Sequence, residues 1–250
     1  MRNVFIILIL ILTLFFAVLF IDDSEEECNN SYVTFTFDDG YEDTYLEAGT
    51  IFKENNVSAT VYIITGLVGG YFENYKLMNW NQIEDLKKNG WEIGSHTVNH
   101  IDLTMISKEE IDKELKDSKI DLKKFGYEVR TLSIPYGAYN SEIKEISKHY
   151  YDATRPSVWG SNYYNDIDRY NLKSYWIVNS TNIDEITSLI DQTEVDNQWI
   201  IFMIHHVSYD KNITYVISPE DITFLIDYIK KKDINIKTMS EVLDLGCINK

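Results

Sequence analysis

The most constraining feature of this sequence is an alternation, from Ser31 onward, of short apolar runs with longer amphipathic stretches. The runs are rich in β-branched and aromatic residues, as strands are, and the stretches between them have the period of helices. Strands are predicted at 32–37, 59–64, 91–94, 131–134, 153, 172–178, 199–204 and 235–238. Helices are predicted at 44–55, 82–89, 108–125, 141–149, 183–191 and 220–232. Repeated βα units predict an α/β fold with a parallel sheet, either a barrel or an open sheet.

The first 27 residues precede this pattern and are typical of a membrane signal. Residues 4–21 contain one polar side chain, Thr13, and an acidic stretch follows at 22–27. A cleaved signal peptide has a shorter apolar region and a small-residue cleavage site, and this segment has neither. We therefore expect 1–27 to be an N-terminal membrane-anchor helix with an acidic juxtamembrane segment, and 28–250 to be one domain.

Charge and cysteine placement bear on where that domain lies. Arg2 precedes the apolar segment, and no positive residue close to its other flank competes with it, so we expect 28–250 to be extracytoplasmic. The domain would be membrane-anchored, or secreted if the N-terminal segment is cleaved. Outside the cytoplasm, Cys28 and Cys247 could form one disulfide that closes the domain, and the alternative is two unrelated thiols.

The balance of charge limits the partners of the chain. There are 23 Lys and Arg residues against 40 Asp and Glu residues, which gives a net charge of −17 with neutral histidines. Such an acidic surface repels phosphate backbones. We therefore expect no nucleic-acid partner. No obligate protein partner is predicted, and we expect the membrane to be contacted through the N-terminal helix.

Polar side chains follow three of the predicted strands at the point where each strand ends. Asp38 and Asp39 follow the strand at 32–37, and other strands are followed by histidines. Four of the five histidines of the chain fall at such positions: His96, His100, His205 and His206. In both parallel architectures the carboxyl ends of the strands converge on one face, where ligands bind. These side chains are therefore expected to lie close together.

The two histidines after the third strand suggest a metal site. His96 and His100 are four residues apart, a spacing that lets both imidazoles reach one point, as in two-histidine zinc sites. With Asp39 they would form a set that leaves coordination positions for water and substrate. The pattern predicts a hydrolytic site with one divalent ion, zinc in the first place and cobalt, nickel or manganese as alternatives.

Several motifs of this chain, taken in order and spacing, resemble a known family. They are Thr36-Phe37-Asp38-Asp39-Gly40, the stretch 79–100 that ends in His96 and His100, Pro135-Tyr136-Gly137, and Ile204-His205. They resemble the polysaccharide deacetylases of carbohydrate esterase family four, over about residues 31–245. The resemblance implies a distorted (β/α) barrel of about seven parallel strands. It also implies metal-dependent removal of acetyl groups from N-acetylated sugars.

The same resemblance implies roles for single residues. Asp38 would be the general base, His205 the general acid, and Tyr136 would lend its backbone N–H to the oxyanion. The implied metal ligands are Asp39, His96 and His100. These roles are chemically coherent, because amide hydrolysis needs an activated water, a stabilised oxyanion and a protonated leaving amine.

Two departures from the family pattern are visible. Many members have an arginine that orients the catalytic aspartate, two residues before the proline of the third motif, and this chain has Ser133 there. Arg130 cannot replace it, because residues 130 and 133 of one strand point to opposite faces. The fourth motif, an Asp-x-x-Asp-Trp that tunes the catalytic histidine, has no match, and Asp166 and Asp168 are the candidates for that role.

Three functions remain compatible with the sequence. The first is hydrolysis of the acetamide of N-acetylglucosamine-type residues in a cell-surface or extracellular polysaccharide, with release of acetate. The second is a non-catalytic, metal-containing carbohydrate-binding surface protein that has lost control of its base. The third is a hydrolase of the same fold that acts on another small amide or ester. Aromatic residues at 66–80 and around Trp159 and Tyr163 could pack on sugar rings or in the core.

Overall fold

The computed structural model describes residues 30–245 and residue 248. The predicted anchor at 1–27 lies outside the described residues, and so do Cys28 and Cys247 of the predicted disulfide. Within 30–245, no helix combines the length and the apolar character that a membrane span requires.

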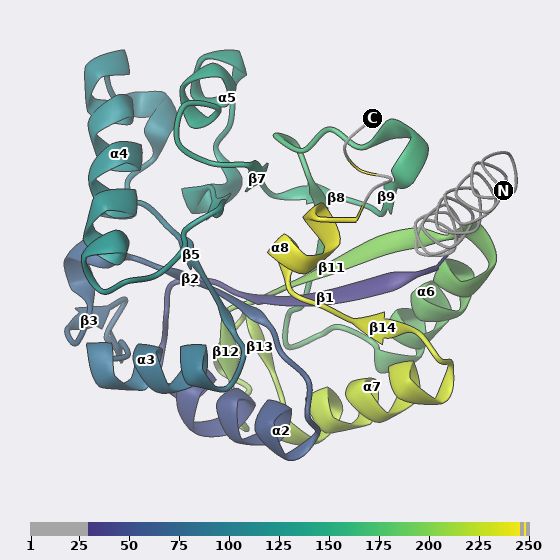
Figure 1. The fold of residues 1–250 in the computed structure, drawn as a ribbon. Helices are drawn as coiled ribbons and strands as arrows, with labels where there is room; N and C mark the ends of the chain where they lie inside the picture. Colours follow the sequence, from purple (N-terminus) through teal and green to yellow (C-terminus); the bar gives the residue numbers. More distant parts are fainter. Residues whose placement is uncertain (1–29, 246–247, 249–250) are drawn as a thin grey trace, which may run out of the picture.

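In the described part of the chain, a ten-stranded sheet forms the centre of the fold (Figure 1). Its strands are β1 (Tyr32–Phe37), β2 (Thr60–Ile63), β5 (Glu92–Ser95), β6 (Thr131–Ser133), β7 (Ala153–Arg155), β8 (Val158–Trp159), β9 (Asn162–Tyr163), β10 (Lys173–Trp176), β11 (Gln198–Ile204) and β14 (Asn235–Ile236). The order is β7-β6-β5-β2-β1-β11-β10-β8, with β14 also beside β1 and β9 beside β11. Every pairing except that of β9 is parallel. The arrangement is a near-closed parallel α/β barrel, as the resemblance implied.

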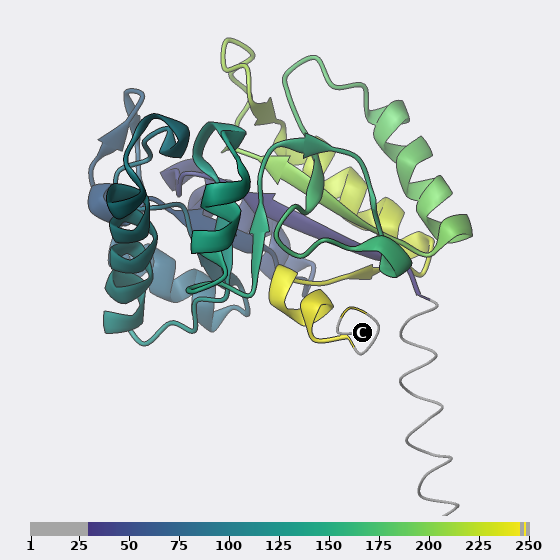
Figure 2. The same ribbon diagram turned by 90° about the horizontal axis from the view of Figure 1, so that it is seen from above.

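Helices surround the sheet, as Figures 1 and 2 show. They are α2 (Gly49–Glu54), α3 (Trp80–Lys88), α4 (Lys108–Lys124), α5 (Ser141–Ser147), α6 (Ile183–Asp196), α7 (Pro219–Lys231) and α8 (Met239–Leu243). A π-helical turn, η1 (Thr44–Ala48), leads into α2. Each of the six predicted helices is present, and most ends agree within two residues. The largest difference is α6, which continues to Asp196 and ends before Asn197, a residue in the left-handed conformation with φ 49°.

Two small sheets and four short 3₁₀ turns complete the described elements. One sheet is the antiparallel hairpin of β3 (Tyr71–Phe72) and β4 (Tyr75–Lys76), and the other pairs β12 (His206–Val207) with β13 (Val216–Ile217). The 3₁₀ turns are η2 (Thr65–Leu67), η3 (Leu103–Met105), η4 (Pro135–Gly137) and η5 (Tyr164–Asp166).

Strands β1 and β11 form the middle of the core. All six residues of β1 and all seven of β11 are buried, as expected for parallel strands that are covered on both faces. Their register pairs Phe37 with Ile204, and the Asp38 N–H donates to the Ile204 carbonyl at 2.8 Å. This register places the residues that follow the two strands, Asp38 and His205, beside each other at one end of the barrel.

The opposite end of the barrel is held by Glu92, at the start of β5. Its Oε1 accepts hydrogen bonds from Thr131 Oγ1 at 2.6 Å and Ser240 Oγ at 2.8 Å. Its Oε2 accepts from Thr60 Oγ1 at 3.1 Å and from the Ser240 N–H at 2.7 Å. One buried carboxylate thus ties three strands to α8. This is the end of β5 away from His96, so these contacts stabilise the fold at a distance from the candidate site.

Candidate active site

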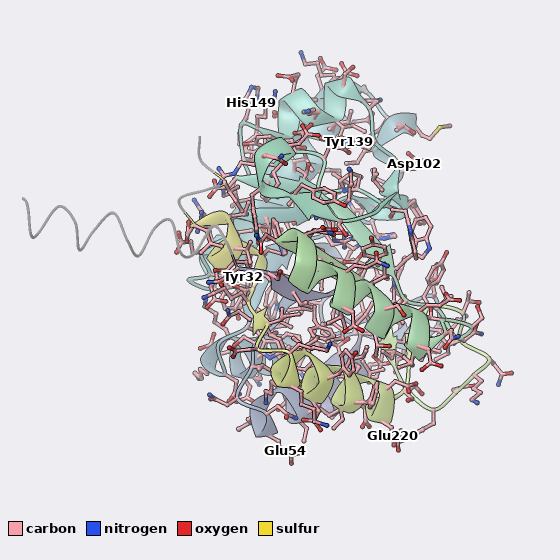
Figure 3. The ribbon with its side chains drawn as sticks, turned by 90° about the vertical axis from the view of Figure 1, so that its right-hand side faces the viewer. Tyr32, Glu54, Asp102, Tyr139, His149 and Glu220 are labelled. Atoms are coloured by element: carbon pink, nitrogen blue, oxygen red, sulfur yellow. The ribbon has the colours of Figure 1, made fainter. Side chains whose placement is uncertain are left out.

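A cavity of about 490 Å³ lies at the carboxyl ends of the central strands. Its walls include all six residues to which the resemblance gave a catalytic or metal-binding role: Asp38, Asp39, His96, His100, Tyr136 and His205. They come from the ends of β1, β5 and β11 and from η4 after β6. The convergence expected from a parallel sheet is therefore observed. The fifth histidine, His149, is exposed at the surface, where Figure 3 labels it.

Asp39, His96 and His100 face one point. The Nε2 atoms of both histidines lie 3.2 Å from Asp39 Oδ1, and all three side chains are buried. Asp39 Oδ1 makes no hydrogen bond, although it is buried. The His96 Nδ1–H donates to the carbonyl of Ser133 at 2.8 Å, which leaves its Nε2 lone pair directed at the same point. The three donor atoms lie within 4.8 Å of one another and fit a divalent ion.

A strained turn positions the two histidines. Thr97 and His100 have φ angles of 64° and 52°, in the left-handed region that side chains rarely adopt. Glu114 of α4 stabilises the turn: its Oε2 accepts the N–H groups of Val98 and Asn99, each at 3.0 Å. The Oε1 of Glu114 accepts a further bond of 2.5 Å from the Asn99 side chain. Glu114 therefore holds the backbone that carries His100.

The charges within this group favour the ligand forms of Asp39 and His100, whereas Asp38 and Asp39 outweigh burial and raise the pKa of His96. Burial raises the pKa of Asp39, but the adjacent His96 imidazole and the charges of the other histidines outweigh it and hold the pKa well below its usual value. Burial lowers the pKa of His100 to about 4, and a charge on His96 acts in the same direction. Asp39 is thus ionised and His100 neutral at pH 7. These are the forms in which a carboxylate and an imidazole bind a metal.

Asp38 is paired with a residue that sequence reasoning missed. Arg155, on β7, contacts Asp38 Oδ1 through its Nη2, and the same atom donates to Ser133 Oγ at 2.7 Å. Ser133 Oγ lies 3.2 Å from Asp38 Oδ2 and donates to it. Burial raises the pKa of Asp38, but the guanidinium of Arg155 and the histidines outweigh it and lower the pKa. Asp38 and Arg155 are 3% and 1% exposed, so the pair is buried.

The pair explains the missing family arginine. Ser133 and Arg155 are register partners on β6 and β7, so their side chains emerge on one face. A small residue at 133 leaves room for the guanidinium that reaches Asp38 from the neighbouring strand. Arg130 points elsewhere and binds Asp152 and Asp244, as its position on the opposite face predicted. The available sequence signal was an arginine, Arg155, two residues after the strand residue predicted at 153. Which residue it contacts depends on the register between β6 and β7.

His205 and Tyr136 line the same cavity as the three candidate metal ligands. Burial lowers the pKa of His205, against the opposing effect of the negative charges of Asp38 and Asp39. The Nδ1 atom of His205 is buried and makes no hydrogen bond. Tyr136 has φ 58° in the turn after Pro135, and its ring lies edge-on to His100 with centroids 4.6 Å apart.

The structure does not bring Asp166 and Asp168 to the cavity. Both side chains are exposed, and neither lines the cavity walls. Asp168 forms an ion pair with Lys144 and accepts the Tyr170 N–H at 3.0 Å. The expected tuning of His205 by these two residues is therefore not supported by where they lie. They were named because they stand near the sequence position of the fourth motif, which does not fix a place in the fold.

His206 was predicted at a strand end, and the structure places it in the cavity wall. Its Nδ1 lies 2.7 Å from Asp43 Oδ2, and its ring stacks on Tyr41 with centroids 3.8 Å apart. Tyr75 of the β3–β4 hairpin packs on the same imidazole at 4.5 Å. His206 thus joins β12 to the hairpin that closes one side of the cavity.

Comparison with known proteins gives the same family. The family model described as "Polysaccharide deacetylase" matches residues 25–154. A putative polysaccharide deacetylase, YxkH, of Bacillus subtilis (strain 168) is 31% identical over 117 residues, covering 46% of this chain and 40% of that protein. A poly-β-1,6-N-acetyl-D-glucosamine N-deacetylase of Staphylococcus aureus (strain MSSA476) is 33% identical over 127 residues, covering 46% of this chain and 44% of the relative. The matches thus span less than half of each of these curated relatives.

Solved structures agree in fold. The peptidoglycan deacetylase PdaC from Bacillus subtilis has a TM-score of 0.58 at 20% identity, over 87% of this chain and 92% of that one. A family 4 carbohydrate esterase from Streptomyces lividans has a TM-score of 0.57 at 16% identity, over 82% of this chain and 91% of that one. At these identities the likeness concerns the fold, while the sequence match covers more than half of the chain. The chain belongs to the polysaccharide deacetylase family.

Proposed function

We propose that this protein is a metal-dependent hydrolase that removes acetyl groups from N-acetylated sugars of a polysaccharide and releases acetate. The observation that carries the proposal is the convergence of Asp39, His96 and His100 beside the buried Asp38–Arg155 pair, in an open cavity. Family membership and the names of the matched relatives support N-acetylglucosamine polymers as the substrate class. The donor set of one carboxylate and two imidazoles suits zinc, and also cobalt, nickel or manganese.

The metal site would supply a Lewis acid for the reaction. A divalent ion held by Asp39, His96 and His100 would polarise a carbonyl oxygen and make a water molecule more acidic. Asp38 is then placed to take a proton, because Arg155 and Ser133 fix the direction of its carboxylate and keep it ionised. Metal binding and proton abstraction would thus fall to two neighbouring residues of one turn, Asp39 and Asp38.

The remaining residues act on the acetyl oxygen and on the leaving amine. The backbone N–H of Tyr136 would donate to the acetyl oxygen as it gains negative charge. When the C–N bond breaks, the amine needs a proton, and His205 at the cavity wall is placed to give one. Burial lowers the pKa of His205, and the carboxylates of Asp38 and Asp39 offset part of this effect in favour of the protonated imidazole. Water supplies the oxygen that acetate gains.

The test is acetate release by the purified full chain, loaded with zinc, from oligomers of N-acetylglucosamine. Removing a general acid or base costs about 10² to 10⁴ in rate, so Asp38→Asn and His205→Ala should each abolish most of the activity. His149→Ala is the matched control, because this histidine is exposed and outside the cavity. Release that survives chelation of the metal, or survives both cavity substitutions, contradicts the proposal.

Two other functions remain as outcomes of that test. Tight metal binding without acetate release from any acetylated glycan would favour a carbohydrate-binding surface protein. That alternative arose because Ser133 stands where many family members have the arginine that orients the base. In this structure Arg155 contacts the proposed base, Asp38, instead. Turnover of small acetamides or esters in place of glycans would favour the third function.

We also propose that the domain is held at the outer face of a membrane by residues 1–27. The support is the apolar segment at 4–21 with Arg2 before it. Protease added to intact cells that express the full chain should degrade the domain, whereas a cytoplasmic domain would be protected until the cells are lysed.

A further inference from the structure

Two tryptophans lie side by side on the protein surface. Trp159 of β8 is 52% exposed, Trp176 at the end of β10 is 37% exposed, and their ring centroids are 5.3 Å apart. The two strands are parallel neighbours, and β8 ends the main path of the sheet. Large aromatic side chains are seldom left adjacent and exposed unless they bind something, because their burial is strongly favourable.

The pair connects two hollows. Trp176 lines the catalytic cavity, close to Met203 and Tyr215. Trp159 and Tyr175 line a second, more open hollow of about 480 Å³ between this edge of the sheet and α6. Because the two indoles are in contact, an extended ligand that leaves the catalytic cavity across Trp176 would reach Trp159 next. The second hollow then lies along its path.

The lining of the second hollow has the mixed character that a sugar requires. One wall is aromatic, and the wall from α6 presents exposed polar side chains: Asp184, Glu185, Ser188 and Gln192. A pyranose ring has an apolar C–H face and a rim of hydroxyl groups. It can therefore lie on an aromatic ring while its hydroxyls are hydrogen-bonded at the side.

We propose that Trp159 and Trp176 form a platform that binds distal sugars of a polysaccharide while one residue occupies the catalytic cavity. The ligand class, a β-linked N-acetylglucosamine polymer, rests on the proposed function. The platform makes the protein selective for polymers over mono- and disaccharides, because a short ligand fills the catalytic cavity without reaching Trp159. This is a binding site outside the catalytic residues, so it can be tested by affinity alone.

The test measures dissociation constants by titration calorimetry on the full chain with zinc, in an Asp38→Asn background that prevents turnover. The probes are dimers and hexamers of N-acetylglucosamine, in separate β-1,4-linked and β-1,6-linked series. For at least one linkage the hexamer should bind about tenfold more tightly than the dimer, the scale of one stacking contact plus its buried apolar area. Trp159→Ala should remove most of this preference, and Trp159→Phe should keep part of it.

Phe224→Ala is the matched control, because Phe224 is an aromatic residue of similar exposure, 48%, that lines neither hollow. Equal hexamer affinity in Trp159→Ala and Phe224→Ala would overturn the platform, and so would a parent protein that binds dimer and hexamer equally. Failure of the enzyme proposal is a separate result. A protein that releases no acetate, yet loses hexamer binding with Trp159→Ala, has the platform without the activity.

Discussion

We predict that removing the charge of Arg155, which is paired with the buried Asp38, lowers both the stability of the fold and the activity. Arg155→Met keeps most of the side-chain volume and removes the positive charge. The Asp38 carboxylate is then left buried without the guanidinium. Of the two side chains that contacted it, Ser133 still donates a hydrogen bond. Removing one partner of a buried ion pair typically costs about 3–5 kcal/mol. Because Ser133 still donates to the carboxylate, we expect the lower end, about 3 kcal/mol.

The sign of the pH dependence follows from the lowered pKa of Asp38. A carboxyl with a depressed pKa in the folded state stabilises the fold above its unfolded pKa, about 4, and this stabilisation is lost as the pH falls through the folded value. The parent should therefore exceed Arg155→Met in stability by the full amount at pH 7. The difference should narrow below about pH 4.

The assay is urea unfolding followed by tryptophan fluorescence, together with acetate release at pH 7. We expect acetate release to fall by about 10²-fold in Arg155→Met, because a misdirected base loses its alignment with the substrate water. Arg130→Met is the control, because it makes the same substitution at an arginine that binds exposed carboxylates away from the cavity. It should cost about 1 kcal/mol or less and leave the rate unchanged.

A strand-to-strand exchange makes the test sharper. The double substitution Ser133→Arg with Arg155→Ser moves the guanidinium to the register partner on β6 and should recover part of the lost activity. The reasoning is refuted if Arg155→Met unfolds at the same urea concentration as the parent and keeps its rate. It is also refuted if the exchange recovers nothing although the double variant folds.

Three further predictions concern residues that support the site or the barrel. Glu114→Ala should lower zinc affinity about 10- to 100-fold with little loss of helical circular dichroism, because Glu114 holds the turn that carries the ligands; unchanged affinity in a zinc titration would contradict this. Glu92→Ala should cost about 3 kcal/mol in urea unfolding, because it leaves the buried hydroxyls of Thr60 and Thr131 without their acceptor; a loss below about 1 kcal/mol would show that water replaces the carboxylate. Gly94→Ala should cost about 1–3 kcal/mol, because a Cβ there would lie 2.5 Å from the Tyr62 ring, and an unchanged melting temperature would mean that the ring moves freely.

Much of the site was predictable because the rules that place it are local. Asp38 and Asp39 follow one apolar run, and His96 and His205 follow two others, so each could be assigned to a strand end from sequence alone. Parallel strands bring their carboxyl ends to one face in a barrel and in an open sheet alike. The convergence in one cavity therefore did not depend on knowing which architecture the chain adopts.

Glu114 shows one kind of information that the sequence does not display. It stands among several acidic residues in the helix at 108–124, and nothing in its neighbours distinguishes it. In the structure it is buried against the turn at 97–100, since α4 packs there, while Glu109 and Glu110 remain exposed. Its role follows from how a helix docks on a loop, which is a tertiary property.

Arg155 shows the other limit, because its partner is set by strand pairing. Alternation along a strand determines the face on which a side chain emerges, and this was enough to exclude Arg130 as the partner of Asp38. It does not determine which residue of the next strand stands beside Ser133. A shift of the β6–β7 register by one residue would turn Arg155 to the opposite face and leave Asp38 buried without a cation. The burial of Asp38 therefore makes the correct register energetically distinct, and the ionic pair that aligns the proposed base also specifies how the strands pair.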